Sequence, residues 1–177
     1  MTSFAATSSI TLPTLRWRQQ SLYLWSAAFV AGNLALPQLC HLANNGGRMF
    51  LPIYFFTLVA ASAFGWRAGV LTALASPLLN HALFGMPPSA TLVPIVAKSL
   101  LIAALAPVLL RRFKLLPLAL LAIVLGYQVL GGLFEWAWTG SRDAALHDFT
   151  IGWPGMALQV LGAWAVLFLV NQTRKNQ

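Results

Sequence analysis

The chain has 177 residues, of which 59% are apolar and only 8% are charged, and its formal net charge at pH 7 is +8. Soluble domains usually carry about 25% charged residues, so this composition excludes an ordinary water-soluble domain and favours lipid as the solvent. The basic residues stand singly or in small groups between apolar runs, which is typical of membrane loops and argues against a nucleic-acid partner.

Six apolar runs come near the roughly 20 residues that a helix needs to cross the hydrocarbon core of a bilayer. They are residues 22–39, 49–64, 68–84, 92–110, 115–138 and 151–170. The second and third runs are short; a tight turn at residues 65–67 joins them, and Gly69 allows close packing after it. The sequence therefore predicts an all-α integral membrane protein with six transmembrane helices. Residues 21–171 would form the membrane domain, between an N-terminal tail (1–20) and a C-terminal tail (172–177).

The basic residues predict the orientation of these helices. Arg48 and Arg142 fall in predicted outer loops, and Lys98 falls inside the fourth run. The other eight lie in segments that share a side with the N-terminus, namely Arg16, Arg18, Arg67, Arg111, Arg112, Lys114, Arg174 and Lys175. Because cytoplasmic loops carry the excess of Lys and Arg, both termini are expected in the cytoplasm, and the chain in the bacterial inner membrane.

Polar side chains inside the runs are costly in lipid and are therefore candidates for function. Several are expected to converge near the outer face, as a solute pocket open to the outside would require. The polar side chains inside the runs are Asn33, Asn80, His81, Lys98, Gln128, Glu135 and Gln159, and all of these except Asn33 are expected near that depth. Structural alternatives stay open for each kind: a Lys98–Glu135 ion pair, a hydrogen bond from His81 to a nearby carbonyl, and interhelical contacts of the glutamines.

A stripe of small residues, Ala27, Ala31 and Ala35, repeats every fourth residue in the first run. Such a stripe lets another helix approach closely in lipid. That helix could belong to this bundle or to a partner subunit, and the spacing does not separate the two.

Motifs for catalysis or energy conversion are missing from the sequence. The single cysteine, Cys40, excludes an internal disulfide, and no zinc-binding spacing, serine-hydrolase motif or Gly-rich phosphate loop occurs. We therefore expect neither an enzyme nor an intrinsic cofactor or metal. Energy for moving a solute would have to come from a partner or an ion gradient.

Four segments in order, 41–52, 64–69, 75–79 and 84–88, resemble a known family. They read HLANNGGRMFLP, FGWRAG, ASPLL and FGMPP. This order is similar to that of the substrate-binding S-components of energy-coupling factor (ECF) transporters. In many of those a Gly-rich outer loop leads to Phe-Leu-Pro, followed by a Gly-x-x-x-Gly turn, Ser-Pro and Gly-Met-Pro-Pro.

The resemblance implies a six-helix S-component bundle that binds a vitamin-like micronutrient from outside. Its partners would be a transmembrane coupling subunit and two ATPase subunits, and the stripe Ala27, Ala31 and Ala35 would be the docking edge. The resemblance implies substrate-binding positions at His41, Arg48, Asn80, His81, Met86, Lys98, Gln128, Glu135 and Trp136.

The resemblance is greatest to the cobalamin-type solitary S-components, which makes a corrinoid the expected substrate and His81 or Met86 a candidate cobalt ligand. The alternative substrates are pantothenate, folate or a queuosine precursor. Two other hypotheses stay open. One is a structural or assembly membrane subunit without a solute, and the other is an intramembrane enzyme acting through Cys40 or His81.

Overall fold

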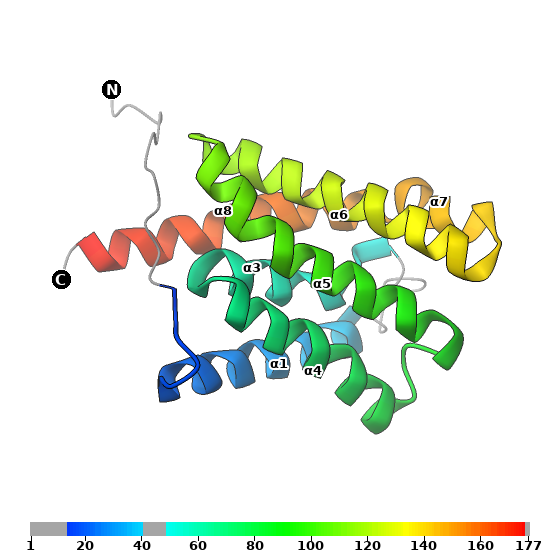
Figure 1. Cartoon of the computed structure of the whole chain (residues 1–177), viewed down its shortest axis with the longest axis horizontal. Helices are drawn as coiled ribbons and strands as arrows, with labels where there is room; N and C mark the ends of the chain where they lie inside the picture. The colour runs from blue at the N-terminus through cyan, green and yellow to red at the C-terminus, as the bar shows by residue number, and fades with distance from the viewer. Residues whose placement is uncertain (1–13, 41–48, 176–177) are drawn as a thin grey trace.

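The computed structural model describes residues 14–40 and 49–175 of the chain, and side chains as far as residue 172. In these ranges the regular elements are helices, and no strand occurs. They are α1 (Gln20–Cys40), the 3₁₀ turn η1 (Pro52–Tyr54), α3 (Phe55–Phe64), α4 (Trp66–Phe84), α5 (Ser89–Arg112), α6 (Leu116–Thr139), α7 (Arg142–Thr150) and α8 (Trp153–Lys175). The long helices run along the long axis of the molecule (Figure 1). The all-α prediction is confirmed, and each predicted apolar run contains a helix.

Three of the helices are long and apolar enough to cross a membrane: α5 and α6 with 24 residues each, and 20 residues of α8. Helices α1 and α4 have 21 and 19 residues, and neither is among these three. The turn η1 has 3 residues and α3 has 10. At the rise of a helix their combined length is about 20 Å, which is less than the thickness of the hydrocarbon core of a bilayer. Membrane character is thus supported by three helices, and crossing by six stays a prediction.

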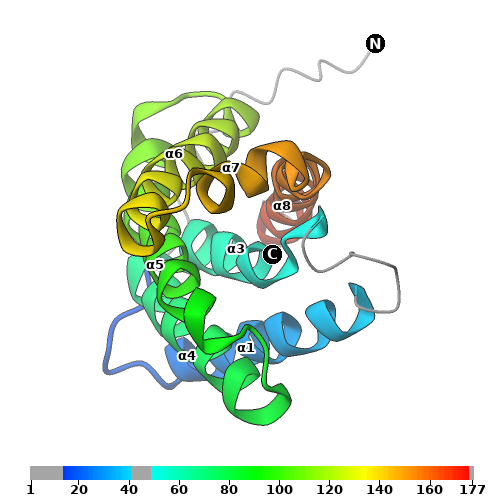
Figure 2. The ribbon, with the colours of Figure 1, turned by 90° about the vertical axis from the view of Figure 1, so that its right-hand side faces the viewer.

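The short helix α3 lies at the centre of the bundle. All its residues from Thr57 to Phe64 are buried, and it contacts α1, α4, α5 and α8 (Figure 2). Two glycines make room for its aromatic side chains. A Cβ at Gly32 of α1 would lie 2.7 Å from the ring of Phe56, and one at Gly162 of α8 would lie 2.8 Å from that of Phe55. A helix surrounded by others need not match the thickness of the bilayer, which explains why a short run suffices here.

The turn between α3 and α4 has the position that the sequence predicts. Gly65 joins the two helices with φ 89° and ψ 178°, a conformation that favours glycine. One turn later, a Cβ at Gly69 would lie 2.7 Å from Ala61 Cβ and 3.0 Å from Ala103 Cβ. The predicted close packing at Gly69 is therefore confirmed, and it joins α3, α4 and α5.

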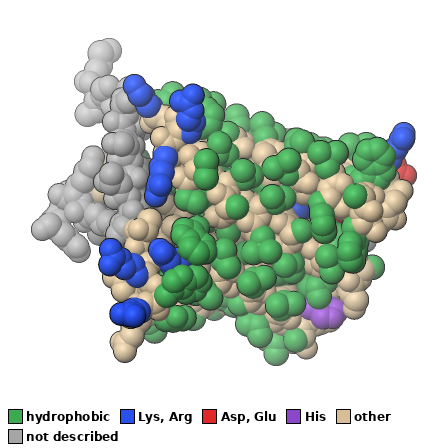
Figure 3. Space-filling view, in the orientation of Figure 1, with side chains coloured by type: hydrophobic (Ala, Val, Ile, Leu, Met, Phe, Trp, Pro, Cys, Tyr) green, Lys and Arg blue, Asp and Glu red, His purple; other side chains and the backbone are tan. Residues whose placement is uncertain are grey.

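Basic side chains gather at one end of the molecule (Figure 3). Helices α1, α4 and α6 begin at this end, and α5 and α8 finish there (Figure 1). The residues that flank these helix ends are Arg16, Arg18, Arg67, Arg111, Arg112 and Lys114, of which all but the partly buried Arg67 are exposed. Arg142 lies at the opposite end, where α6 meets α7.

The stretch expected as an outer loop around Arg142 is largely the helix α7. Gly140, in the left-handed conformation at φ 70°, ends α6, and the Oγ of Ser141 accepts a hydrogen bond of 3.2 Å from the main-chain N–H of Ala144. Asp143 in the first turn favours the same helix start. At the other end of the chain α8 continues to Lys175, so the tail predicted from residue 172 begins inside a helix.

Candidate functional site

Lys98 of α5 lies between two carboxylates near the end of the molecule that is opposite the basic end. Its Nζ is 2.6 Å from Glu135 Oε2 on α6 and 2.8 Å from Asp148 Oδ2 on α7. The side chain of Lys98 is 3% exposed, and those of Glu135 and Asp148 are 12% and 13% exposed. We call these three residues the charged cluster. It joins three helices and carries one positive and two negative formal charges.

A glycine in α6 makes the position of Lys98 possible. A Cβ at Gly131 would overlap Cγ of Lys98, so only a glycine there lets the lysine stem lie flat on the helix. Gly132, the next residue, faces α7, and a Cβ there would lie 3.2 Å from the carbonyl oxygen of Ala145. The Gly131–Gly132 pair thus admits the lysine of α5 and the backbone of α7 at neighbouring positions.

Two buried glutamines lie deeper in the bundle, and they differ in whether their amides have hydrogen-bond partners. Gln159 accepts a hydrogen bond of 2.7 Å from the Tyr127 hydroxyl and donates one of 3.3 Å to the carbonyl of Leu51. The interhelical interpretation of Gln159 is therefore confirmed. Gln128 is 1% exposed, and neither atom of its amide has a partner among the described residues. It lies on the same face of α6 as Glu135, about two turns away.

Asn80 belongs to a second polar network, between α1, α3 and α4. Pro37 inside α1 has no N–H to donate to the carbonyl of Asn33, and Asn80 Nδ2 donates to that carbonyl instead, at 3.1 Å. The side chain of Asn33 donates to the hydroxyls of Thr57 and Ser76 at 3.1 and 3.0 Å. These contacts hold α1 to the bundle, which is a structural role for Asn80.

His81 and Met86 lie at the connection between α4 and α5. Nδ1 of His81 is 2.7 Å from the carbonyl oxygen of Pro87, as the structural alternative for this histidine predicts. Met86 is 41% exposed. No group of three or more side chains suited to a metal comes together in the parts of the chain that the structure describes.

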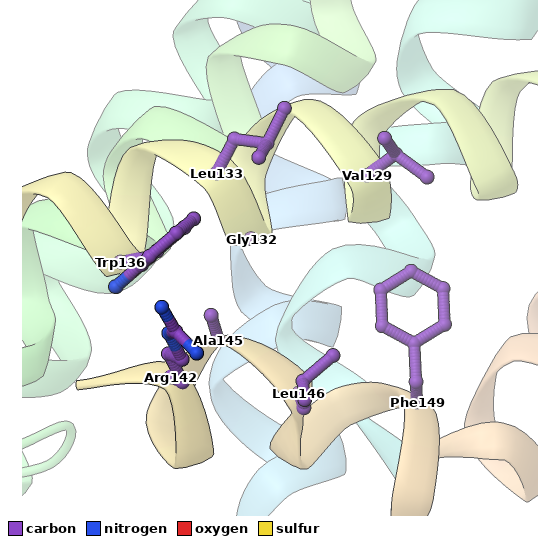
Figure 4. Close-up of a pocket in the computed structure, with 8 residues that line it drawn as sticks. All are labelled: Val129, Gly132, Leu133, Trp136, Arg142, Ala145, Leu146 and Phe149. Atoms are coloured by element: carbon purple, nitrogen blue, oxygen red, sulfur yellow. The ribbon is translucent and has the colours of Figure 1, made fainter.

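Trp136 lines an apolar groove between α6 and α7 (Figure 4). The groove has a volume of about 300 Å³. Its lining residues are Val129, Gly132, Leu133, Trp136, Arg142, Ala145, Leu146 and Phe149. The guanidinium carbon of Arg142 lies 5.2 Å from the centre of the Trp136 ring, a cation–π contact at the mouth of the groove.

The alanine stripe of α1 is turned away from the bundle. Ala27, Ala31 and Ala35 are exposed, whereas Ser26, Val30, Asn33 and Pro37 of the same helix are buried. Internal packing within this chain, one of the two interpretations of the stripe, therefore does not apply to these alanines.

The sequence therefore predicts part of the charged cluster. Lys98 and Glu135 were expected near each other, and the structure brings them into contact. Two other predicted site residues, His41 and Arg48, lie outside the described residues. Asp148 was not predicted, although the chain has only three acidic residues and this one stands three residues before an apolar run. An acid so near a membrane run is a signal that could have indicated it.

Comparison of the whole chain with family models, with curated proteins and with solved structures finds no match. Fold and site together define a helical protein with three helices suited to a membrane and a buried charged cluster near one end.

Proposed function

We propose that this protein is a membrane subunit that binds a vitamin-like micronutrient from outside the cell and delivers it inward, as an S-component of an ECF transporter does. In this proposal the bundle crosses the inner membrane of a bacterium with six helical segments and both termini in the cytoplasm. Cobalamin or a related corrinoid stays the first substrate candidate by resemblance, and the chain itself is not an enzyme.

The observation that carries the proposal is the charged cluster. Charged side chains are expensive at membrane depth and usually mark a pathway or a binding site. Lys98 lies about two turns inside α5, and Glu135 about one turn before the end of α6. The basic residues at the opposite end favour that end as the cytoplasmic one, so the charged cluster would face the outside.

A second observation supports a partner subunit. The face of α1 that bears Ala27, Ala31 and Ala35 is exposed and small, as a helix interface in lipid requires. We propose that a transmembrane coupling subunit docks there, and that two ATPase subunits attached to it supply the energy.

The test is purification in detergent from cells grown in rich medium, followed by mass spectrometry of bound small molecules and titration with radiolabelled vitamins. The proposal expects one vitamin-like solute to bind saturably and to raise the midpoint of thermal unfolding. Absence of saturable binding of every vitamin tested, with no solute retained on purification, contradicts it.

The exposed stripe also favours a second candidate, an assembly subunit with no solute of its own. That candidate expects the protein to co-purify with other membrane proteins while binding no vitamin. Variants of Lys98 would then change stability without changing any uptake.

A further inference from the structure

We infer that the solute bound by this protein carries a protonated amine or amidinium group, and that Glu135 and Asp148 bind this group. The inference rests on the proposed function of solute binding and replaces its first substrate candidate, because the side chains of cobalamin are amides and carry no protonated amine. It follows from the charge balance of the cluster, from the free acceptor atoms of the two carboxylates and from the neighbouring Gln128.

Among the described residues, the charge balance of the cluster leaves an excess of one negative charge. Lys98 forms ion pairs with both Glu135 and Asp148, and no other described residue pairs with either carboxylate. One ammonium between two carboxylates gives a formal charge of −1 at a site where all three side chains are largely buried. Such an excess charge is costly in a poorly solvated site, and a cation at the site would be stabilised by it.

The free oxygens give this cation a place to bind. Lys98 engages Oε2 of Glu135 and Oδ2 of Asp148, and within the described chain no donor reaches Oε1 or Oδ1. A carboxylate can accept hydrogen bonds on both oxygens. Two acceptors from two helices suit a group with several N–H donors, such as a primary ammonium, better than a quaternary ammonium, which has none.

The residual exposure of the carboxylates indicates how a solute would approach. Glu135 and Asp148 retain 12% and 13% of their side-chain surface, whereas Lys98 retains 3%. The lysine therefore lies behind the two acids, as seen from outside the bundle. A solute arriving from that side meets negative charge first, and an anionic group would have to displace a carboxylate to reach Lys98.

Gln128 is the second, independent observation that indicates a ligand. Its amide is buried at 1% exposure with donor and acceptor both unpartnered, on the α6 face that carries Glu135. Leaving such a group unpaired costs about 1–3 kcal/mol. Gly131 lies between the two residues, and the stem of Lys98 lies over it. A polar solute bound by its amine at Glu135 would reach Gln128 by displacing this lysine stem.

The experiment compares solutes that share one skeleton and differ in the amine. The probes are pyridoxamine with pyridoxine, and pantothenate, biotin and cobalamin as solutes of other classes. Binding is measured by titration of the purified full-length protein. The inference expects the amine-bearing member of a pair, or an amine-bearing solute retained on purification, to bind about tenfold to a hundredfold more tightly than its amine-free counterpart.

The variants Glu135→Gln and Asp148→Asn should remove this preference, and Asp143→Asn on the same helix should keep it. Tight binding of an anionic or neutral solute that survives both cluster variants would overturn the inference and leave the proposed function standing. Binding of no solute at all would overturn both. Cation binding that is absent from the wild type and appears in Arg48→Gln would also overturn the inference, because Arg48 would then neutralise the cluster.

Discussion

Asn80 of α4 donates a hydrogen bond to the main-chain carbonyl of Asn33, the carbonyl that Pro37 leaves without its helical donor. The proline therefore creates an acceptor inside α1, and the asparagine 47 residues further along the chain satisfies it. Because both residues are buried, the bond ties α1 to α4 in a place that water does not reach. This relationship predicts that the two positions depend on each other.

The first prediction concerns that dependence. Asn80→Ala should lower the free energy of unfolding by about 1–3 kcal/mol, since it leaves the carbonyl of Asn33 buried and unpaired. In a Pro37→Ala background the restored N–H can bond to the same carbonyl, so the cost of Asn80→Ala should be smaller. Thermal unfolding in detergent of the four proteins measures the coupling. Equal costs in the two backgrounds would show that Asn80 does not replace the missing helical bond.

The second prediction concerns the charged cluster. Lys98→Met should destabilise the protein by about 3–5 kcal/mol, because it leaves Glu135 and Asp148 buried close together without a cation. Asp148→Asn should cost less, since Lys98 keeps its contact with Glu135. Asp143→Asn, at an exposed position on α7, is the matched control and should cost at most about 1 kcal/mol, the contribution of a charge in the first turn of a helix. A Lys98→Met protein as stable as the wild type would contradict the ion pairs.

The third prediction concerns the glycine beneath the lysine. Gly131→Ala should destabilise the protein, because the new methyl group overlaps the stem of Lys98 and pushes its ammonium away from the carboxylates. Gly126→Ala on the same helix is the control. Its Cβ would lie 3.2 Å from the mobile end of Leu105, so the gain in helix propensity, up to about 1 kcal/mol, should offset any crowding. If both variants unfold at the same temperature, Gly131 is not needed to place Lys98.

The fourth prediction concerns the alanine stripe and the proposed partner. Ala31→Leu should leave folding and solute binding intact, since the side chain is exposed, and should abolish uptake by blocking close approach of the coupling subunit. Ala104→Leu, at an exposed position on α5, is the matched control and should retain uptake. Uptake and binding are measured in parallel on cells that carry each variant. Retention of uptake by Ala31→Leu would remove the stripe from the proposed interface.

The fifth prediction concerns orientation. In a Cys40→Ser background, Asp143→Cys should react with a membrane-impermeant maleimide on intact cells, whereas Lys114→Cys should react only after permeabilisation. Both positions are exposed. Lys114 lies just before the start of α6, and Asp143 lies beyond its end, in the first turn of α7. The reverse labelling pattern would contradict the proposed orientation with the basic end in the cytoplasm.

The helices could be predicted closely because lipid requires long apolar segments whose backbone groups bond within the segment. The apolar run at 115–138 corresponds to α6 at Leu116–Thr139. The turn predicted at residues 65–67 corresponds to Gly65, where α3 ends and α4 begins. Helix α7 was missed because it is neither long nor apolar. Its signal is local, a serine cap after a glycine with an acid in the first turn.

The sequence by itself determined the helical class, the position of each apolar segment, the basic end of the bundle and Lys98 and Glu135 as candidate polar residues. These follow from composition and from the charges that stand beside each run. Only the tertiary structure decided that Asp148 completes the cluster, 50 residues from Lys98, and that Asn80 serves α1 instead. The physical reason is that such pairs depend on how helices pack, here on the glycines that let α5 and α7 approach α6 and on a proline that leaves a carbonyl unpaired.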